Sequence, residues 1–377
     1  MNAPSTALRA QDTTGSAVLH MSMELGERTW WLTFGDGRHG PSRHHTGAGD
    51  VGAVLLAIAK VKQRWALPVT ASVCSCYEAG RDGWWLHRSL LQHGIDNVVV
   101  DSASIERNRR ARQAKTDRID GDKLLGLLMR HHGGERGMWS VVRAPTEEQE
   151  DQRWLHREML RLQHERTTHT NRIGSLLALQ GLRVASIGTP AWNAWWAEHA
   201  SALRAGVRQQ IERECQRLAL VQQQLRELRS QRHAQVRQGV HPQVNQLMKL
   251  RAIGETSAWL LCMELFAWRA FANRRQLAAC IGLAPTPYDS GTLRAEQGIT
   301  KAGNKRCRAL LVELAWLWLR LQPHSALTQW FRHRFGSGKR TRRIGIVALA
   351  RRLVVALWRY LEHGVIPEGA TLKPVSV

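Results

Sequence analysis

Apolar positions in the first third of the chain predict strands that alternate with helices. Short apolar runs at Val18–Leu25 and Thr29–Phe34, followed by the turn Gly35-Asp36-Gly37, predict an antiparallel hairpin. A third strand is expected around Ser42–Thr46. Beyond it the pattern predicts a helix capped by Asp50, a strand at Val69–Tyr77, a helix at Asp82–His93, a strand at Asn97–Asp101 and a last helix from near Thr116. The sequence therefore predicts a mixed α/β domain over residues 18–135.

The middle of the chain, residues 146–240, lacks strand signals and carries apolar residues at three- and four-residue steps, such as Leu155, Met159 and Leu162. This spacing predicts two long helices in coiled-coil-like packing, broken near Gly181–Pro190. A plain helical hairpin would explain the pattern. An assembly role is favoured, because an apolar seam of this length needs a partner.

Residues 244–364 are expected to be all-α, interrupted by a loop rich in Gly, Pro and Ser from Gly282 to Gly303. The segment 247–258 is typical of a helix-hairpin-helix turn, in which Gly254 would let the backbone approach a phosphate. A simple tight turn between helices is the alternative. Residues 365–377 are expected to form a disordered tail.

The charge balance points to a polyanionic partner. The 377 residues, enough for two or three domains, hold 54 Lys and Arg against 31 Asp and Glu, a formal charge of +23. No apolar run is long enough for a membrane span, and the N-terminus has no signal-peptide pattern. The six cysteines include no C-x-x-C pair, which favours a reducing cytoplasm and no zinc site.

Four carboxylates occupy positions at which a metal site could form. Glu24 ends the first strand, Glu78 follows the strand at 69–77, and Asp117 and Asp120 share one face at the start of a helix. The order β-β-β-α-β-α-β-α is the outline of a ribonuclease-H-like sheet, in which the ends of the first and fourth strands adjoin and the last helix packs across them. Two Mg²⁺ ions would relieve the repulsion among these acids and could clamp a phosphodiester.

Other interpretations of these acids stay open. Glu24 and Glu78 could be exposed strand-end acids, and the two aspartates could complement a helix N-terminus. Asp122 is an alternative to Asp120, and Asp36 is an alternative to Glu24.

Basic residues flank the candidate chemistry. Next to an acidic metal site, the run of Arg107, Arg109, Arg110, Arg112 and Lys115 is expected to contact phosphates. In the C-terminal half, Ser290-Gly291 could be ordinary turn chemistry or, beside cations, an oxygen nucleophile, and Tyr288 is a second hydroxyl nearby. The residues expected to bind nucleic acid in this half are Gly254, Lys301, Asn304, Arg306 and Arg308, and the helix carrying Arg153, Arg157 and Arg161 offers a face for an RNA backbone.

Several short motifs together resemble one family, the DEDD-type insertion-sequence transposases, which are RNA-guided bridge recombinases. Each motif is weak alone, and their order and spacing are specific. The matching motifs are Cys-Tyr-Glu-Ala-Gly at 76–80, Lys-Thr-Asp-Arg-Ile-Asp at 115–120, Asn171-Arg172-Ile173, Ile253-Gly254, Gly282-Leu283-Ala284-Pro285, Ser290-Gly291 and Gly303-Asn304 with Arg308.

The resemblance implies a RuvC-like domain joined to a helical transposase domain, in a bacterial, nucleoid-associated protein. It implies that Glu24, Glu78, Asp117 and Asp120 hold Mg²⁺, with Glu24 standing where the family has Asp, and that Ser290 attacks DNA and becomes covalently linked to it. It further implies a structured guide RNA that pairs with donor and target DNA, and a homo-oligomer built as a dimer of dimers. The alternatives are a Holliday-junction-type nuclease that uses water, and a non-catalytic nucleic-acid-binding scaffold.

Overall fold

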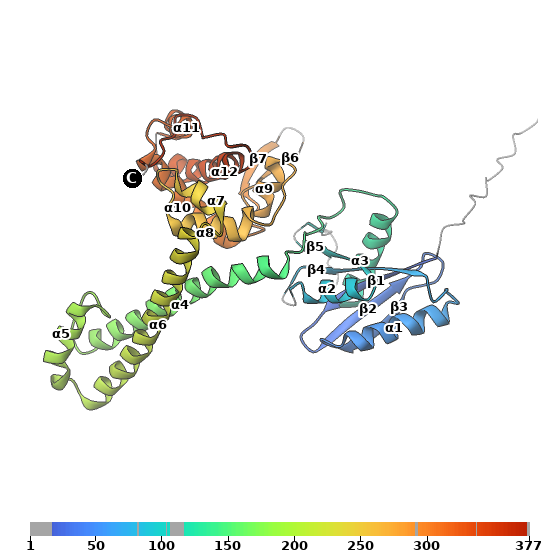
Figure 1. The fold of residues 1–377 in the computed structure, drawn as a ribbon, viewed down its shortest axis with the longest axis horizontal. Coiled ribbons are helices and arrows are strands. Elements are labelled where there is room, and N and C mark those ends of the chain that lie inside the picture. Colours follow the sequence, from blue (N-terminus) through green and yellow to red (C-terminus); the bar gives the residue numbers. More distant parts are fainter. Residues whose placement is uncertain are drawn as a thin grey trace, which may run out of the picture. The chain divides into compact units, whose positions relative to one another are not determined.

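The chain divides into two units, residues 1–144 and 145–377, each with its own core (Figure 1). The computed structural model describes residues 17–80, 83–102, 104–105, 117–290, 293–336 and 338–374.

A five-stranded mixed sheet with strand order β3-β2-β1-β4-β5 is the centre of the first unit. Strand β2 pairs antiparallel with β1 and β3, whereas β4 pairs parallel with β1 and β5. The elements of this unit are β1 (Val18–Leu25), β2 (Thr29–Gly35), β3 (Ser42–Gly47), α1 (Val51–Arg64), β4 (Ser72–Glu78), α2 (Trp85–Gln92), β5 (Asp96–Val100) and α3 (Asp117–His132).

Alternation along β1 decides which helices cover each face of the sheet. Leu19 and Met23 pack in one cluster with Ile58 of α1 and Leu90 of α2. His20 and Ser22, which alternate with the residues of this cluster, point to the opposite face, where the Ser22 hydroxyl donates a 2.8 Å hydrogen bond to a backbone carbonyl of α3. The sheet therefore lies between α1 and α2 on one face and α3 on the other.

The strands and helices predicted for this unit are confirmed, but α2 begins at Trp85, and Asp82, where that helix was expected to begin, lies outside the described residues. Asp50 caps α1 by accepting a 2.8 Å hydrogen bond from the Ala53 amide. Strand β4 begins at Ser72 rather than Val69, because residues 68–71 form a turn in which the Ala71 amide donates to the Pro68 carbonyl. Val69 is exposed as a result.

Two long helices, α4 (Glu147–Ala178) and α6 (Ala205–Arg237), begin the second unit and pack against each other, with α5 (Pro190–His199) between them in sequence. Their seam is antiparallel and pairs Met159 and Leu162 with Val221 and Leu225, then Ile173 and Leu177 with Ile211 and Leu218. The apolar seam thus finds its partner within one chain. The helical hairpin accounts for the pattern by itself, and an assembly role stays a prediction.

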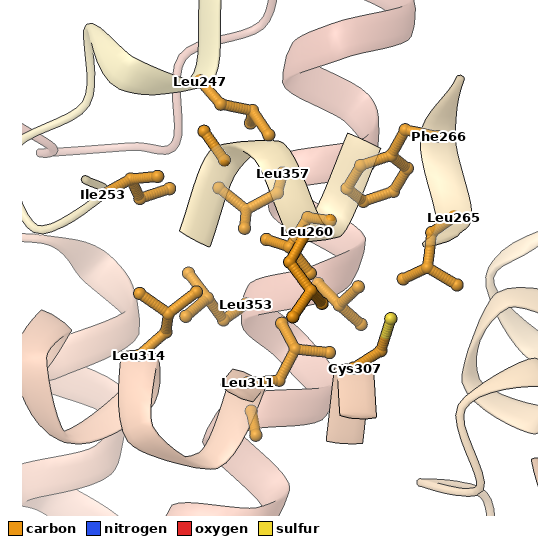
Figure 2. Close-up of a cluster of buried hydrophobic side chains, with 14 of the residues drawn as sticks. Leu247, Ile253, Leu260, Leu265, Phe266, Cys307, Leu311, Leu314, Leu353 and Leu357 are labelled. Carbon is orange, nitrogen blue, oxygen red and sulfur yellow. The ribbon is translucent and has the colours of Figure 1, made fainter. Parts of the chain in front are cut away.

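The rest of the second unit packs helices around one core, part of which Figure 2 shows. Leu260, Leu311 and Leu353 bring three helices together in it. The elements are α7 (Pro242–Met248), α8 (Glu255–Leu261), a π-helical turn η2 (Cys262–Phe266), α9 (Arg274–Cys280), β6 (Pro285–Ser290), β7 (Leu293–Ile299), α10 (Lys305–Leu321), α11 (Ala326–Phe335) and α12 (Lys339–His363). The loop expected from Gly282 to Gly303 is therefore wrong in part, because an antiparallel hairpin occupies most of it.

The prediction of a disordered tail is wrong for residues 365–374. Leu372 bridges Leu250, the Lys373 amide donates to the Lys249 carbonyl at 2.7 Å, and the Lys373 ammonium donates to the Ile253 carbonyl at 2.7 Å. The tail thus supplies hydrogen-bond partners to backbone groups of the turn between α7 and α8.

The longest helices carry many charges. Helix α12 has 25 residues, of which seven are Lys or Arg. Among the helices that the structure describes, none combines the length and apolar character that crossing a bilayer requires.

Candidate active site

Glu24 and Glu78 end neighbouring parallel strands at the same edge of the sheet. The register pairs Met23 of β1 with Tyr77 of β4, so the two glutamates follow at adjacent positions. Each lies two residues beyond a side chain that contacts α3, Ser22 in β1 and Cys76 in β4. Since side chains two apart on a strand share a face, both carboxylates project on the side of the sheet that α3 covers.

Helix α3 brings its first turns to this edge. Gly121 accepts the hydrogen bond from Ser22, and at the far end of the helix the ring of His132 lies 5.0 Å from that of His20, near the start of β1. The helix therefore runs antiparallel to β1, and its N-terminus lies where β1 and β4 end.

A glycine permits the close approach of α3 to the sheet. A Cβ at Gly121 would lie 2.7 Å from the hydroxyl of Thr33, so any larger residue would push the helix away. Asp120 precedes this glycine and is carried to the edge with it. Asp117 begins the helix one turn earlier, and its side chain lies outside the described residues.

The structure separates the two alternative acids from this edge. Asp122 is bound by the guanidinium of Arg43 on β3 at 2.6 and 3.1 Å. Asp36 follows β2 at the opposite end of the sheet, since Gly35 pairs with His20, and it accepts hydrogen bonds from the amide and ring of His39. Burial would raise the pKa of Asp36, but these hydrogen bonds hold it below its usual value. Asp36 therefore closes a turn.

The chemistry of the edge suits a hard divalent cation, because all of its candidate ligands are carboxylate oxygens. Among the side chains that the structure describes, no three His, Cys, Asp or Glu groups are close enough to form a metal site as they stand. That set does not include the side chain of Asp117. The predicted phosphate-contacting residues Arg107, Arg109, Arg110, Arg112 and Lys115 also lie outside the described residues.

In the second unit, Ser290 and the predicted cations lie at opposite ends of one hairpin. Ser290 pairs with Leu293 at the end of β6, whereas Pro285 pairs with Ile299 at its base. The Lys301 amide donates to the Gly282 carbonyl at 3.1 Å, which fixes Lys301 beside the base. Five residues of strand span about 17 Å, so the expectation that Ser290 lies beside Lys301 and the cations of α10 is wrong within one chain.

Two glycines make the base of this hairpin tight. Gly303 has φ +112°, and a Cβ there would lie 2.3 Å from the Cys280 carbonyl oxygen. Gly282 has φ +67°, and its missing side chain leaves room for the carbonyl of Ala302. The guanidinium of Arg308 donates to the Ile281 carbonyl at 3.0 Å. Arg308 therefore holds the hairpin base together.

Asn304 also has a structural role. Its side-chain oxygen accepts from the amides of Arg306 and Cys307 at 3.0 and 3.1 Å, which caps α10, and its amide nitrogen donates to Glu264 at 3.1 Å. Lys301 and Arg306 are exposed and could reach a phosphate. Of the residues expected to bind nucleic acid, Asn304 and Arg308 instead use their side chains for hydrogen bonds within the chain.

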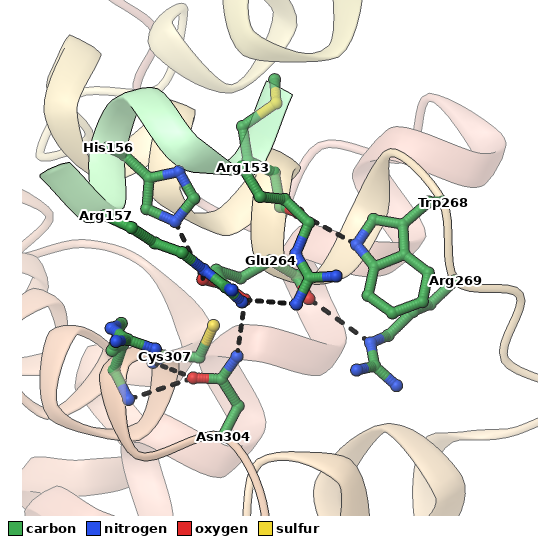
Figure 3. Close-up of polar contacts among 10 residues, drawn as sticks. Arg153, His156, Arg157, Glu264, Trp268, Arg269, Asn304 and Cys307 are labelled. Atoms are coloured by element: carbon green, nitrogen blue, oxygen red, sulfur yellow. Dashed lines mark hydrogen bonds and ion pairs between the residues drawn. The ribbon is translucent and has the colours of Figure 1, made fainter. Parts of the chain in front are cut away.

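The acid that organises this region, Glu264, was missed from the sequence. Its side chain is fully buried, and Figure 3 shows groups from α4 and α10 converging on it. The imidazole of His156 lies 2.9 Å from it, Arg157 donates two hydrogen bonds at 2.9 and 3.1 Å, and Arg153 lies 3.6 Å away. We call these residues with Asn304 the Glu264 cluster.

Charge and burial act in opposite directions on Glu264. Burial alone would raise the pKa of Glu264, but the hydrogen bonds from His156 and Arg157 and the charge of Arg157 outweigh it and hold the pKa far below its usual range. The carboxyl group is ionised at neutral pH. The charges of Arg153 and Arg157 are therefore compensated within the chain by Glu264. Of the arginines expected to face RNA, only Arg161 has a well-exposed side chain.

Gly254 lies at the first turn of α8 and caps that helix without a side-chain bond. The next residue, Glu255, is bound by Arg232 at 2.7 Å and by His233 at 2.8 Å. With Lys373 on the carbonyl of Ile253, this helix start already has an acid and a lysine beside it. Nothing in this arrangement singles out Gly254 as a phosphate contact.

Comparisons with known proteins identify the family of the chain. Residues 244–329 match the family model "Transposase IS116/IS110/IS902 family". The chain is 38% identical to "Putative transposase y4rJ" of Sinorhizobium fredii (strain NBRC 101917 / NGR234), over 94% of this chain and 95% of the relative. The chain belongs to the IS116/IS110/IS902 transposase family. It is also 31% identical to the "Transposase for insertion sequence element IS1328" of Yersinia enterocolitica, over 32% of this chain and 36% of the relative.

Family membership confirms the coarse part of the resemblance. The protein is a transposase of a mobile element, and its substrates are DNA. The matched segment of the transposase contains Glu264, Asn304 and the hairpin that carries Ser290.

Proposed function

We propose that this transposase cuts and rejoins DNA with an acidic, metal-dependent site in its first unit. The unit is taken to be a RuvC-like domain of ribonuclease-H-like fold, which the strand order β3-β2-β1-β4-β5 supports. The observation that carries the proposal is the convergence of Glu24, Glu78 and the N-terminus of α3 at one edge of the sheet.

Glu24, Glu78, Asp117 and Asp120 would hold Mg²⁺. When bound, the metal would polarise a phosphodiester and lower the pKa of an attacking hydroxyl or water. The chain contributes the placement: two strands fix two carboxylates on one face, and the glycine at position 121 lets α3 bring the aspartates to them. Glu24, the last residue but one of β1, extends its carboxylate one methylene further than an aspartate would.

The family resemblance supports three finer parts of the proposal. Ser290 would attack DNA and become covalently linked to it, a structured guide RNA would pair with donor and target DNA, and the active protein would be a dimer of dimers. Because Ser290 lies at the far end of its hairpin from Lys301, that lysine is not placed to help deprotonate it. In an oligomer, the acidic site of another subunit could supply that help.

One observation favours an alternative. Ser290 lies at the far end of its hairpin from Lys301, and an acidic metal site can activate water by itself. The transposase could therefore cut as a Holliday-junction-type nuclease does, with no protein–DNA adduct.

Neutralising one candidate ligand tests the acidic site. Asp120→Asn keeps the shape of the side chain and removes a charge that the cation needs, so we expect strand cleavage in Mg²⁺ to be abolished while DNA binding survives. Asp122→Asn is the matched control two residues away, because Asp122 is bound by Arg43 on the neighbouring part of the sheet. Full cleavage by Asp120→Asn, or loss in Asp122→Asn alone, would place the metal site elsewhere.

A further inference from the structure

The connection between α11 and α12 carries a concentration of positive charge that lies beyond the segment matched by the family model. Residues 314–361 contain ten Lys and Arg and no Asp or Glu. Six of these cations cluster around the connection, and all six are exposed: Arg332, Arg334, Lys339, Arg340, Arg342 and Arg343. We call these six residues the α11–α12 cationic surface.

None of the six forms an ion pair with an acid in the part of the chain that the structure describes. This contrasts with the arginines of α4 and α6, several of which are bound to the buried acids Glu264 and Glu214. Instead, cations of α11 and α12 lie close to one another. The pKa of Arg352 on α12 is lowered, first by burial and then by the charge of Arg334.

The two helices that carry this surface pack closely against each other. A Cβ at Gly345 would lie 2.4 Å from the ring of Phe335, so the last residue of α11 packs directly on the backbone of α12. The guanidinium of Arg342 lies 6.0 Å from the ring centre of Trp316 on α10, and that of Arg352 lies 3.8 Å from the ring centre of Trp330 on α11. These contacts hold the two helices that carry the cations against each other and against α10, and Arg342 is itself held over a ring.

Charges at the start of α12 oppose the helix that carries them. Lys339, Arg340, Arg342 and Arg343 lie in its first turns, where the helix dipole is positive and no acid is present. The helix dipole disfavours such cations, most strongly in the first turn. A polyanion lying against this end of α12 would offset that effect.

We propose that the α11–α12 cationic surface binds the phosphate backbone of duplex DNA. Duplex is favoured over single strands because the surface offers cations on fixed helices, and because Arg342 lies over Trp316, the ring that unstacked bases could otherwise use. DNA is favoured over RNA because the substrates of a transposase are DNA. The inference rests on that substrate class alone and needs neither the metal site nor Ser290.

Salt-dependent DNA binding by the full-length protein tests the proposal. The triple variant Lys339→Gln/Arg340→Gln/Arg343→Gln removes three charges for which the structure shows no intramolecular partner. The probe is a duplex of about 30 base pairs without Mg²⁺, so a failure of the catalytic proposal does not affect the result. We expect the slope of log K against log salt to fall by up to about three, since each phosphate contact contributes about 0.9.

The control is Arg226→Gln/Arg229→Gln/Arg237→Gln, which removes the same charge from exposed positions on α6. Thermal unfolding shows that both variants fold, and the α12 variant should be as stable as the wild type or slightly more stable. An equal fall in slope for both triples would mean that net charge alone is responsible, and no fall in the α12 triple would remove the site. Loss of binding to duplex RNA with unchanged binding to duplex DNA would show that the partner is RNA.

Discussion

Replacing Glu264 by Gln should destabilise the second unit more than any other single charge removal that the structure suggests. The substitution keeps the volume of the side chain and removes the charge that faces Arg153, His156 and Arg157. Both arginine side chains are mostly buried, at 11% and 26% exposed, and water cannot replace the lost carboxylate easily. Removing one partner of a buried ion pair costs about 3–5 kcal/mol.

This cost is a large fraction of the total, because a domain is stable by only about 5–15 kcal/mol. Hydrogen exchange measured by mass spectrometry on peptides from α4 and α10 reports the free energy of opening where the two elements meet. We expect it to fall by about 3–5 kcal/mol in Glu264→Gln. The control is Glu158→Gln on the same helix α4, whose exposed pair with Arg161 should contribute at most about 1 kcal/mol.

A double variant distinguishes the loss of the ion-pair attraction from the cost of leaving buried cations without a partner. If the cost comes from leaving cations buried without a partner, then Arg157→Gln added to Glu264→Gln should cost much less than the sum of the two single changes. Equal effects of Glu264→Gln and Glu158→Gln, both below about 1 kcal/mol, would refute the reasoning.

Three further outcomes follow. The pKa of Glu264 is lowered, so the ionised carboxylate contributes its full stabilisation above the pKa of an unfolded glutamate, about 4.3, and this stabilisation is lost as the pH falls from there through the lowered value. Acid should therefore narrow the difference in opening free energy between the wild type and Glu264→Gln. A constant difference down to pH 3 would contradict this. Gly303→Ala should destabilise the hairpin base by several kcal/mol more than Gly298→Ala, because both have positive φ but only the Cβ at Gly303 meets backbone, and exchange in β7 peptides measures this. Ser290→Ala should abolish a covalent adduct with labelled DNA that Tyr288→Phe retains, as peptide mapping would show; an adduct on Tyr288 would remove the serine mechanism.

The first unit could be predicted from the sequence because its signals are local. Leu19, Met21 and Met23 alternate with residues that contact α3, and this period of two specifies both the strand and its faces. Once the strand order was outlined, the ends of β1 and β4 had to adjoin, which placed Glu24 and Glu78 together. Asp122 differs from Asp120 in being bound by Arg43, and no local pattern reveals that partner.

The second unit was predicted less well because its decisive contacts are distant in sequence. Glu264 is a single acid in the apolar run Leu260–Phe266, and its partners on α4 are more than 100 residues away. The hairpin of β6 and β7 starts with two prolines and lies between glycines, which are typical of loops. Residues 365–374 are ordered because Lys373 binds the turn at 249–253, a contact that their own composition does not indicate.

The net charge of +23 therefore overstates the positive surface that this transposase can offer to nucleic acid. Every arginine bound to a buried acid is neutralised inside the chain, however favourable its spacing on a helix looks in the sequence. The arginines used in this way include Arg153 and Arg157 at Glu264 and Arg172 and Arg217 at Glu214, and Arg232 is likewise bound to the half-buried Glu255. A long stretch without any acid, such as residues 314–361, is the better indicator, because its cations find no carboxylate nearby in sequence. Such cations stay available to phosphates, and this difference, rather than the total charge, is what should distinguish the α12 and α6 triple variants in salt-dependent binding.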